Sequence, residues 1–199
     1  MTGKICHPPT HNMGFTLIEL LVALALAAIF LLATMSIANM SIRSYGDQER
    51  VSDAQQSVRA ALDLMVRDIR MAGYDPMAIS HGPTTGIGIL VATETMLQFS
   101  ADLNADRADS GGSENLTYFY DAGSKRLRQK EGGKAYPQTF IEKVSDLKFS
   151  YLDANGGPPA GLGDIAVVVV ALTVQNRYQK GGTFERTLTT RINCRNLRM

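Results

Sequence analysis

The sequence contains few of the residues on which enzymes and disulfide-stabilised proteins depend. Two cysteines in 199 residues are too few for a disulfide scaffold. The three histidines are His7, His11 and His81, and the chain contains no HExxH, CxxC, P-loop or GxSxG pattern. The chain is therefore predicted not to be an enzyme.

The chain also lacks an excess of charge of one sign. It contains 20 Lys and Arg residues and 19 Asp and Glu residues, so its formal net charge is +1. This balance produces no field that could draw the whole protein onto nucleic acid or acidic lipid, and no specific nucleic acid is expected as a partner. The length suits one domain, and the sequence contains no internal repeat or low-complexity tract.

One long apolar run stands out against this average. Between Phe15 and Met35 the only polar residues are Thr16, Glu19 and Thr34. As a helix this segment would be roughly 31 Å long, about the thickness of the hydrocarbon core of a bilayer. The alternative is a helix buried in a protein core, but the uninterrupted apolar stretch 20–33 has no polar face. Residues 15–35 are therefore predicted to span a membrane.

The flanks of this run differ from those of a secretory signal peptide. A signal peptide carries its cleavage site after the apolar stretch, whereas the plausible processing site here, Gly14, precedes it. Cleavage after Gly14 would remove residues 1–14 as a leader and leave the helix on the mature protein. The basic residues on the two sides are too evenly divided for the positive-inside rule to give the orientation.

The residues GFTLIELLVALA, Gly14 to Ala25, resemble the prepilin signature of type IV pilins and of the pseudopilins of type II secretion systems. The resemblance implies that a prepilin peptidase cuts after Gly14 and methylates the new amino terminus of Phe15. Glu19 is then the fifth mature residue, as in the family. The helix first anchors the subunit in the inner membrane, with the carboxy-terminal domain in the periplasm, and later packs into a pilus or pseudopilus. The implied partners are the peptidase, membrane lipid, other minor and major pilins and the inner-membrane assembly platform.

Glu19 is an unusual residue for a membrane helix. A carboxylate within the hydrocarbon costs about 2.5–3.5 kcal/mol on insertion scales, and such residues usually have a partner. The ammonium group of Phe15 in a neighbouring subunit would lie at a similar depth, and pairing with it would lower the cost of both charges. The alternative is that Glu19 merely extends to the lipid headgroups.

The helix is predicted to continue beyond the membrane through residues 36–73. Apolar residues recur there at three- and four-residue steps, which indicates one buried face. They are Val51, Ala54, Val58, Ala61, Leu62, Met65 and Ile69. Gly73 followed by Pro76 ends the pattern. Two helices broken near Gly46 are the alternative.

Residues 74–199 are predicted to form a β-rich domain, so the fold class is α+β, with the long helix packed on a mainly antiparallel sheet. Residues 165–174 are apolar on both faces, as in a central strand covered on both sides. Other strands are expected at 96–100, 116–120, 125–129, 147–151 and 188–194, and loops at 74–95, 102–114, 131–140 and 153–163. Cys194 is expected in the core.

Three further segments resemble PilW-type minor pilins, a group that primes pilus assembly and lies at or near the tip. They are VRDIRMAGYDP (Val66–Pro76), VSDLKFSYLD (Val144–Asp153) and RTLTTRINCRNL (Arg186–Leu197). The architecture also resembles the J-type minor pseudopilin of type II secretion. A bitopic membrane protein with a sensor or degenerate enzyme domain is a more distant alternative.

One loop has the composition of a calcium site. Asp102, Asn104 and Asp106 place oxygen donors at alternate positions, with Asp109 and Glu114 downstream, as in an EF-hand-like loop. The match is incomplete, because position 107 is Arg where the sharp turn favours Gly and Glu114 comes one residue late. Calcium binding is the prediction, and an ordinary solvated acidic loop is the alternative.

Overall fold

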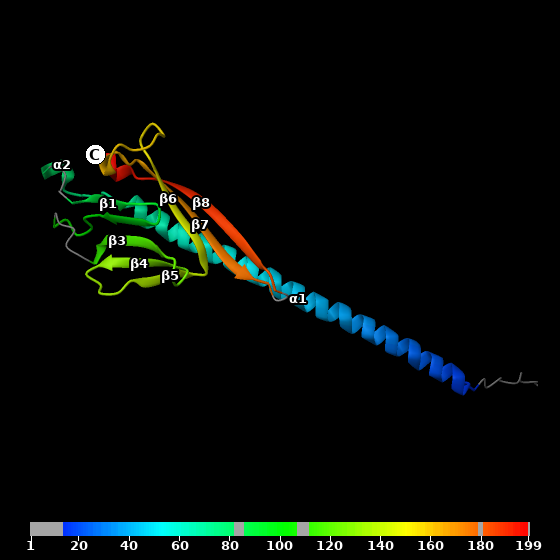
Figure 1. The fold of residues 1–199 in the computed structure, drawn as a ribbon. Coiled ribbons are helices and arrows are strands. Elements are labelled where there is room, and N and C mark those ends of the chain that lie inside the picture. Colours follow the sequence, from blue (N-terminus) through cyan, green and yellow to red (C-terminus); the bar gives the residue numbers. More distant parts are fainter. Residues whose placement is uncertain (1–13, 82–85, 107–111, 179–180, 199) are drawn as a thin grey trace, which may run out of the picture. The chain divides into compact units, whose positions relative to one another are not determined.

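The computed structural model describes residues 14–81, 86–106, 112–178 and 181–198. The chain divides into two compact units, residues 1–46 and 47–199. A single helix, α1 (Leu17–Arg70), runs through the boundary between the units without interruption at Gly46 (Figure 1). The alternative of two helices broken at this glycine is therefore wrong. The absence of proline and of a second glycine from this stretch explains the continuity.

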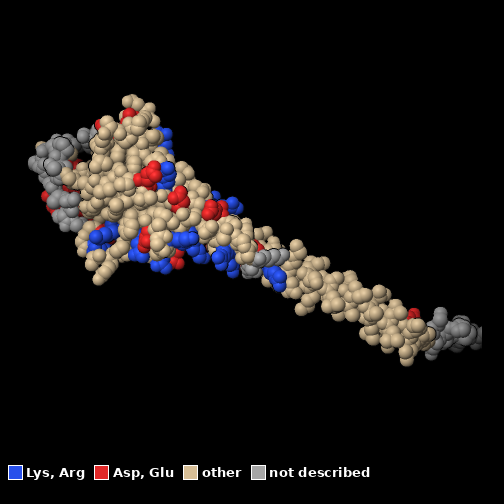
Figure 2. Space-filling view, in the orientation of Figure 1, with Lys and Arg blue, Asp and Glu red and all other residues tan. Residues whose placement is uncertain are grey.

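In the first unit the side chains of α1 are exposed from Leu17 to Ser44. Its most apolar 18-residue window has a mean hydropathy of 2.7, with no part of the window buried, and it is long enough to cross a membrane. Figure 2 shows this part of the helix as a nearly uncharged surface. Its hydroxyls bond within the helix, because Thr34 Oγ1 donates to the Leu31 carbonyl at 2.9 Å and Ser36 Oγ to the Leu32 carbonyl at 2.9 Å. These bonds lower the cost of placing hydroxyls in an apolar environment.

In the second unit α1 is amphipathic, as its residue periodicity predicts. Its buried residues are Val58, Ala61, Leu62, Met65 and Ile69. The helix ends at Arg70, whose carbonyl accepts a hydrogen bond from Asn196 Nδ2 at 3.0 Å. Gly73 follows with φ 78°, the left-handed conformation that commonly terminates a helix. The predicted stop near Gly73 is thus confirmed.

Among the described residues of the second unit, eight antiparallel strands form two sheets. The five-stranded sheet has the order β1 (Gly88–Ala92), β2 (Met96–Ser100), β3 (Gly112–Asp121), β4 (Arg126–Gly132) and β5 (Gln138–Glu142). The three-stranded sheet has the order β6 (Val144–Leu152), β7 (Val167–Arg177) and β8 (Thr183–Asn193). Three short helices complete the fold: α2 (Ala78–His81), η1 (Leu162–Asp164) and η2 (Arg195–Arg198). The α+β class is confirmed, but one sheet was expected and the structure has two.

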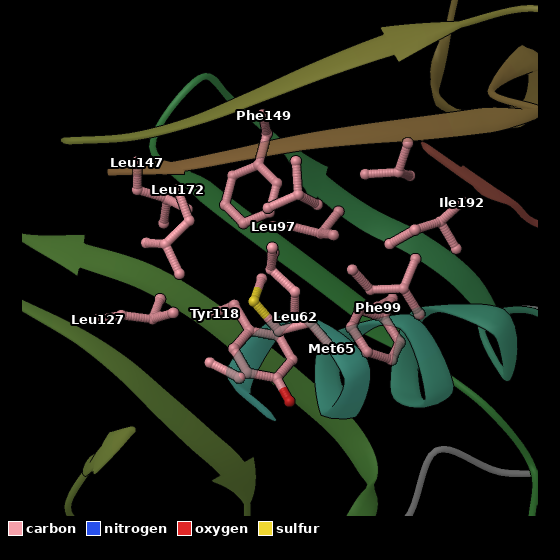
Figure 3. Close-up of a cluster of buried hydrophobic side chains, with 14 of the residues drawn as sticks. Leu62, Met65, Leu97, Phe99, Tyr118, Leu127, Leu147, Phe149, Leu172 and Ile192 are labelled. Atoms are coloured by element: carbon pink, nitrogen blue, oxygen red, sulfur yellow. The ribbon is translucent and has the colours of Figure 1, made fainter. Parts of the chain in front are cut away.

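A single hydrophobic core joins α1 to both sheets (Figure 3). Met65 from α1, Leu97 and Tyr118 from the five-stranded sheet, and Phe149 and Leu172 from the three-stranded sheet are fully buried or nearly so. Because each sheet buries one face against the same helix face, neither sheet has its own core. The second half of α1 is therefore an integral part of the folded unit.

Two strands lie where loops were expected. β1 lies within the expected loop 74–95, and β5 overlaps the expected loop 131–140. β5 is an outermost strand with exposed polar residues at Gln138 and Thr139, so it lacks the alternation that marks a half-buried strand. β1 follows a Gly- and Pro-containing segment that favours a loop on local grounds.

The expectation for β7 is also only partly correct. Val168, Val170, Leu172 and Val174 on one face are buried, whereas the side chains between them are only half-buried. β7 is the middle strand of its sheet, but only one face packs into the core. On the other face Val167 is buried and Val169 is half-buried, and a valine suits an extended strand even without full burial because β-branched residues favour the pleated conformation.

Candidate functional site

The predicted processing site lies directly before the first turn of α1. Gly14, Phe15 and Thr16 are non-helical, and the helix begins at Leu17. A Cβ atom added to Gly14 would meet no atom within 4 Å, and the φ angle of Gly14 lies outside the left-handed region. Neither packing nor backbone geometry in this chain therefore requires glycine at position 14.

Thr16 caps the start of α1, and its hydroxyl also contacts the side chain of Glu19. The amide of Glu19 donates to Thr16 Oγ1 at 3.3 Å, and the Thr16 hydroxyl donates to Glu19 Oε2 at 3.5 Å, at the limit for such a bond. The Thr16 side chain thus satisfies one of the first amides of the helix, which have no partner within it. The Thr-x-x-Glu spacing was visible in the sequence, but this local role of Glu19 was not predicted.

The side chains around this cap are exposed. Phe15 is 85% exposed, and Leu17 and Ile18 are similarly open. Such a continuous apolar surface requires a cover of lipid or of other apolar helices.

Two families of known proteins match this chain, one mainly in each unit. The prokaryotic N-terminal methylation motif matches residues 14–35, which begin at the predicted processing glycine. The family described as prepilin peptidase-dependent protein B matches residues 47–194, nearly the whole second unit. The chain belongs to this family. It is thus a prepilin peptidase-dependent, pilin-like protein, and the predicted relation to the type IV pilins is confirmed.

A solved structure is similar to this prepilin peptidase-dependent protein. It is a type IV-like pilin from Thermus thermophilus, with 10% identity and a TM-score of 0.47 over 72% of this chain and 98% of that chain. No curated protein matches the chain.

The predicted calcium loop is held by its own side chains. Asp102 Oδ1 accepts the amide of Ala105 at 2.7 Å, and Glu114 Oε1 accepts the amides of Leu103 and Asn104 at 3.0 and 3.2 Å. Both carboxylates are buried, Glu114 with 6% of its surface exposed. Oxygens of these two acids thus point at the loop backbone.

The rest of the loop makes similar turns. Asn104 Oδ1 accepts the amide of Asp106 at 2.8 Å, and Asn104 Nδ2 donates to Asp106 Oδ2 at 3.0 Å. Asp109 lies outside the described residues. Within the described ranges no three His, Cys, Asp or Glu side chains gather in a way that could hold a metal ion. Calcium binding stays a prediction.

A polar contact that the sequence did not reveal ties α1 to the five-stranded sheet. The hydroxyl of Tyr118, a fully buried residue of β3, donates to Asp68 Oδ2 of α1 at 2.5 Å. Gln129 Nε2 of β4 donates to the Tyr118 hydroxyl at 3.0 Å. Burial raises the pKa of Asp68, and the hydrogen bond from Tyr118 partly opposes this shift. No sequence signal marks the contact, because its members lie far apart along the chain.

Cys194 lies in the core, as expected, with 1% of its surface exposed. Its Sγ is 3.9 Å from the Ile69 carbonyl, and burial raises the pKa of the thiol to about 11. A buried thiol with a raised pKa is a poor nucleophile, so this residue has a packing role.

Proposed function

We propose that this protein is a minor pilin, a structural and non-enzymatic subunit that helps to prime assembly of a type IV pilus and lies at or near its tip. The observation that supports this most directly is the position of Gly14. A glycine that the fold does not require stands immediately before an exposed apolar helix, within a methylation motif. Recognition by a peptidase that cleaves after this glycine would explain why glycine stands at this position, whereas the fold does not explain it.

The proposed life of the subunit has two stages. In the first, residues 15–35 cross the inner membrane once, the second unit faces the periplasm, and lipid covers the apolar side chains. In the second, helices of other pilins replace the lipid when the assembly platform extracts the subunit. Lipid and the helices of other pilins can each bury the same exposed apolar surface. Replacing one by the other therefore needs no refolding of the second unit.

The processing step is tested by co-expression with a prepilin peptidase and intact-mass measurement. We expect loss of residues 1–14, a chain that begins at Phe15 and a methyl group on its amino terminus. Gly14→Ala should slow cleavage without changing membrane insertion, since it leaves the apolar run unaltered. A chain that stays uncut, or is cut after Ala33, contradicts the proposal.

Glu19 would pair with the amino-terminal ammonium group of Phe15 in a neighbouring subunit during assembly. Glu19 allows a matched pair of variants. Glu19→Gln keeps a side chain that can accept a hydrogen bond from the Thr16 hydroxyl but removes the charge, whereas Glu19→Leu removes both. If charge pairing drives assembly, both variants should insert and be cleaved, and both should fail to prime pili. Normal pilus numbers with Glu19→Gln would leave Glu19 with its contact to Thr16 alone.

The same features also suit a J-type minor pseudopilin. A strain that lacks this protein distinguishes the two systems, because loss of pili with normal protein secretion supports the minor pilin. Normal pili with defective secretion would assign it to a pseudopilus instead.

A further inference from the structure

A groove of about 910 Å³ lies between α1, β5 and the end of β7 in the second unit. It continues into a second hollow of about 420 Å³ beside the β3–β4 turn. The two hollows share Glu142, Lys143, Gln175 and Asn176 as lining residues. We call the combined depression the trough.

Basic side chains dominate the second hollow. Its charged lining residues are Lys125, Arg126, Lys143, Arg177 and a single acid, Glu142. Arg126 pairs with Glu142 at 2.9 Å, which leaves three cations on the lining without an acidic partner among the described residues. This end of the trough is therefore positively charged and suits a ligand that carries carboxylates.

Two of these cations occupy backbone positions that favour glycine. Lys125 has φ 52° and Lys143 has φ 60°, both in the left-handed region that side chains rarely adopt. Long-range hydrogen bonds hold them there, since the Lys125 carbonyl accepts the amide of Val144 at 3.0 Å and the Lys143 carbonyl accepts that of Gln175 at 2.8 Å. Glycine would satisfy the same bonds with less strain. These bonds fix the backbones of two residues that line the second hollow.

The other end of the trough is the groove between β5 and α1. β5 is the last strand of its sheet and pairs with β4 alone in the part of the chain that the structure describes. Thr139 to Glu142 of β5 line the groove, and an outer edge without a paired strand has backbone donors and acceptors to offer. The facing wall of α1 contains the small residues Ala54, Ser57, Ala60 and Ala61, and Arg50, Asp53 and Leu64 line the same side. An added extended segment would find hydrogen-bonding partners on one side and room on the other.

We propose that the trough binds an extended acidic segment of a neighbouring pilin subunit. Its carboxylates meet Lys125, Lys143 and Arg177, and its backbone runs along the free edge of β5. Charge complementarity favours an acidic partner, and the unpaired edge of β5 favours an extended peptide. A free phosphate or a lipid headgroup would fill the basic end and leave the β5 edge and the α1 wall uncovered. The inference rests on the proposed role as a pilus subunit.

Binding of a fluorescent hexaglutamate peptide to the detergent-solubilised full chain tests the trough. Lys125→Gly together with Lys143→Gly should weaken binding about tenfold, the effect of losing two charge pairs of about 0.7 kcal/mol each. The same variant should unfold at an equal or higher temperature, because glycine suits both φ angles. Ala105→Gly, at the other described non-glycine residue with positive φ, is the matched control and should leave binding unchanged.

A second variant tests the groove without changing charge. Ser57→Trp places a large side chain on the α1 wall and should also weaken hexaglutamate binding, whereas a hexaglutamine peptide should not bind the parent. Unchanged affinity in the double glycine variant or in Ser57→Trp overturns the proposal. Displacement of the peptide by inorganic phosphate, or by glycerophosphoglycerol as a soluble lipid headgroup, at matched ionic strength also overturns it, since the occupant would then be a small anion or a lipid.

A photo-crosslinking residue at Ser57 of the full chain, expressed with the other pilins, identifies the occupant in cells. We expect a crosslink to an acid-rich peptide of another pilin. A crosslink to a peptide without acidic residues, or none, contradicts the inference. Cleavage at Gly14 is scored on the same chain, so failure of the proposed function appears as an uncut protein and failure of the trough as a cut protein without this crosslink.

Discussion

Removing the hydroxyl of Tyr118 should loosen the attachment of α1 to the five-stranded sheet. In Tyr118→Phe the ring still packs near Phe140, whose centroid lies 5.3 Å away, but Asp68 loses its short hydrogen bond. A hydrogen bond to a charged group contributes about 1.5–3 kcal/mol. Because Asp68 is only half-buried and water can replace part of the bond, we expect the lower end, about 1.5 kcal/mol.

For a folded unit of this size, about 1.5 kcal/mol corresponds to a melting temperature lower by roughly 3–6 °C. Thermal unfolding of the detergent-solubilised full chain, followed by circular dichroism, measures the shift. Tyr136→Phe is the control, because Tyr136 is 83% exposed and the same hydroxyl is removed from a solvated position. If the two variants melt at the same temperature as the parent, the reasoning about the buried contact is refuted.

The pH dependence of the free energy of unfolding tests the contribution of Asp68 to the same contact. Its pKa in the folded state is raised, mainly by burial. A raised pKa means that Asp68 contributes stability below its unfolded value of about 3.9, and that this contribution is lost as the pH rises through the folded-state pKa. The parent should therefore lose stability relative to Asp68→Asn as the pH rises above about 4. A difference that is flat, or that changes in the opposite direction, contradicts the assignment.

Three further predictions concern other parts of the second unit. Gly73→Ala should lower the free energy of unfolding in urea by about 2–3 kcal/mol, because φ is left-handed there and the new Cβ would lie 2.6 Å from a side-chain atom of η2. Gly156→Ala has a similar φ but open space around the new Cβ, so its free energy of unfolding should fall by less. Cys194 in the cleaved native chain should resist maleimide at pH 8 and react once after denaturation, and rapid labelling of the native chain would contradict its burial. If the loop binds calcium, a hundredfold excess of calcium over Kd should stabilise the full chain by roughly 2.7 kcal/mol and raise its melting temperature. The double variant Asp102→Ala, Asp106→Ala should not show this rise. An unchanged melting temperature of the parent would mean that the loop is an ordinary turn closed by its own carboxylates.

Local patterns were enough to predict several elements of this protein. The strand expected at 96–100 is β2 (Met96–Ser100), and the helix expected to end near Gly73 ends at Arg70. The predicted buried residues of the second half of α1 include Val58, Leu62 and Met65, which are in the core. Each of these features depends on residues a few positions apart, so the periodicity of the chain contains the information.

The candidate sites were predictable to different degrees. Glu19 stands out because a carboxylate conflicts with an ordinary apolar helix, which is visible without coordinates. Gly14 was predicted from its position before the apolar run and from the resemblance to the prepilin signature. The acidic loop was found from its composition, but the role of Glu114 toward the amides of Leu103 and Asn104 depends on how β3 packs beside the loop. Spacing alone could not distinguish oxygens that face an ion from oxygens that face the backbone.

The sequence alone did not predict the division into two sheets, the edge strand β5 or the trough. Alternation reports that one face of a strand is buried, but not which strands share a sheet, because pairing joins residues distant along the chain. The left-handed conformations of Lys125 and Lys143 are likewise imposed by hydrogen bonds from Val144 and Gln175. The apolar helix and the predicted processing glycine before it are thus properties of local sequence, whereas the surface that would receive a neighbour exists only because long-range pairing brings three turns and a helix together.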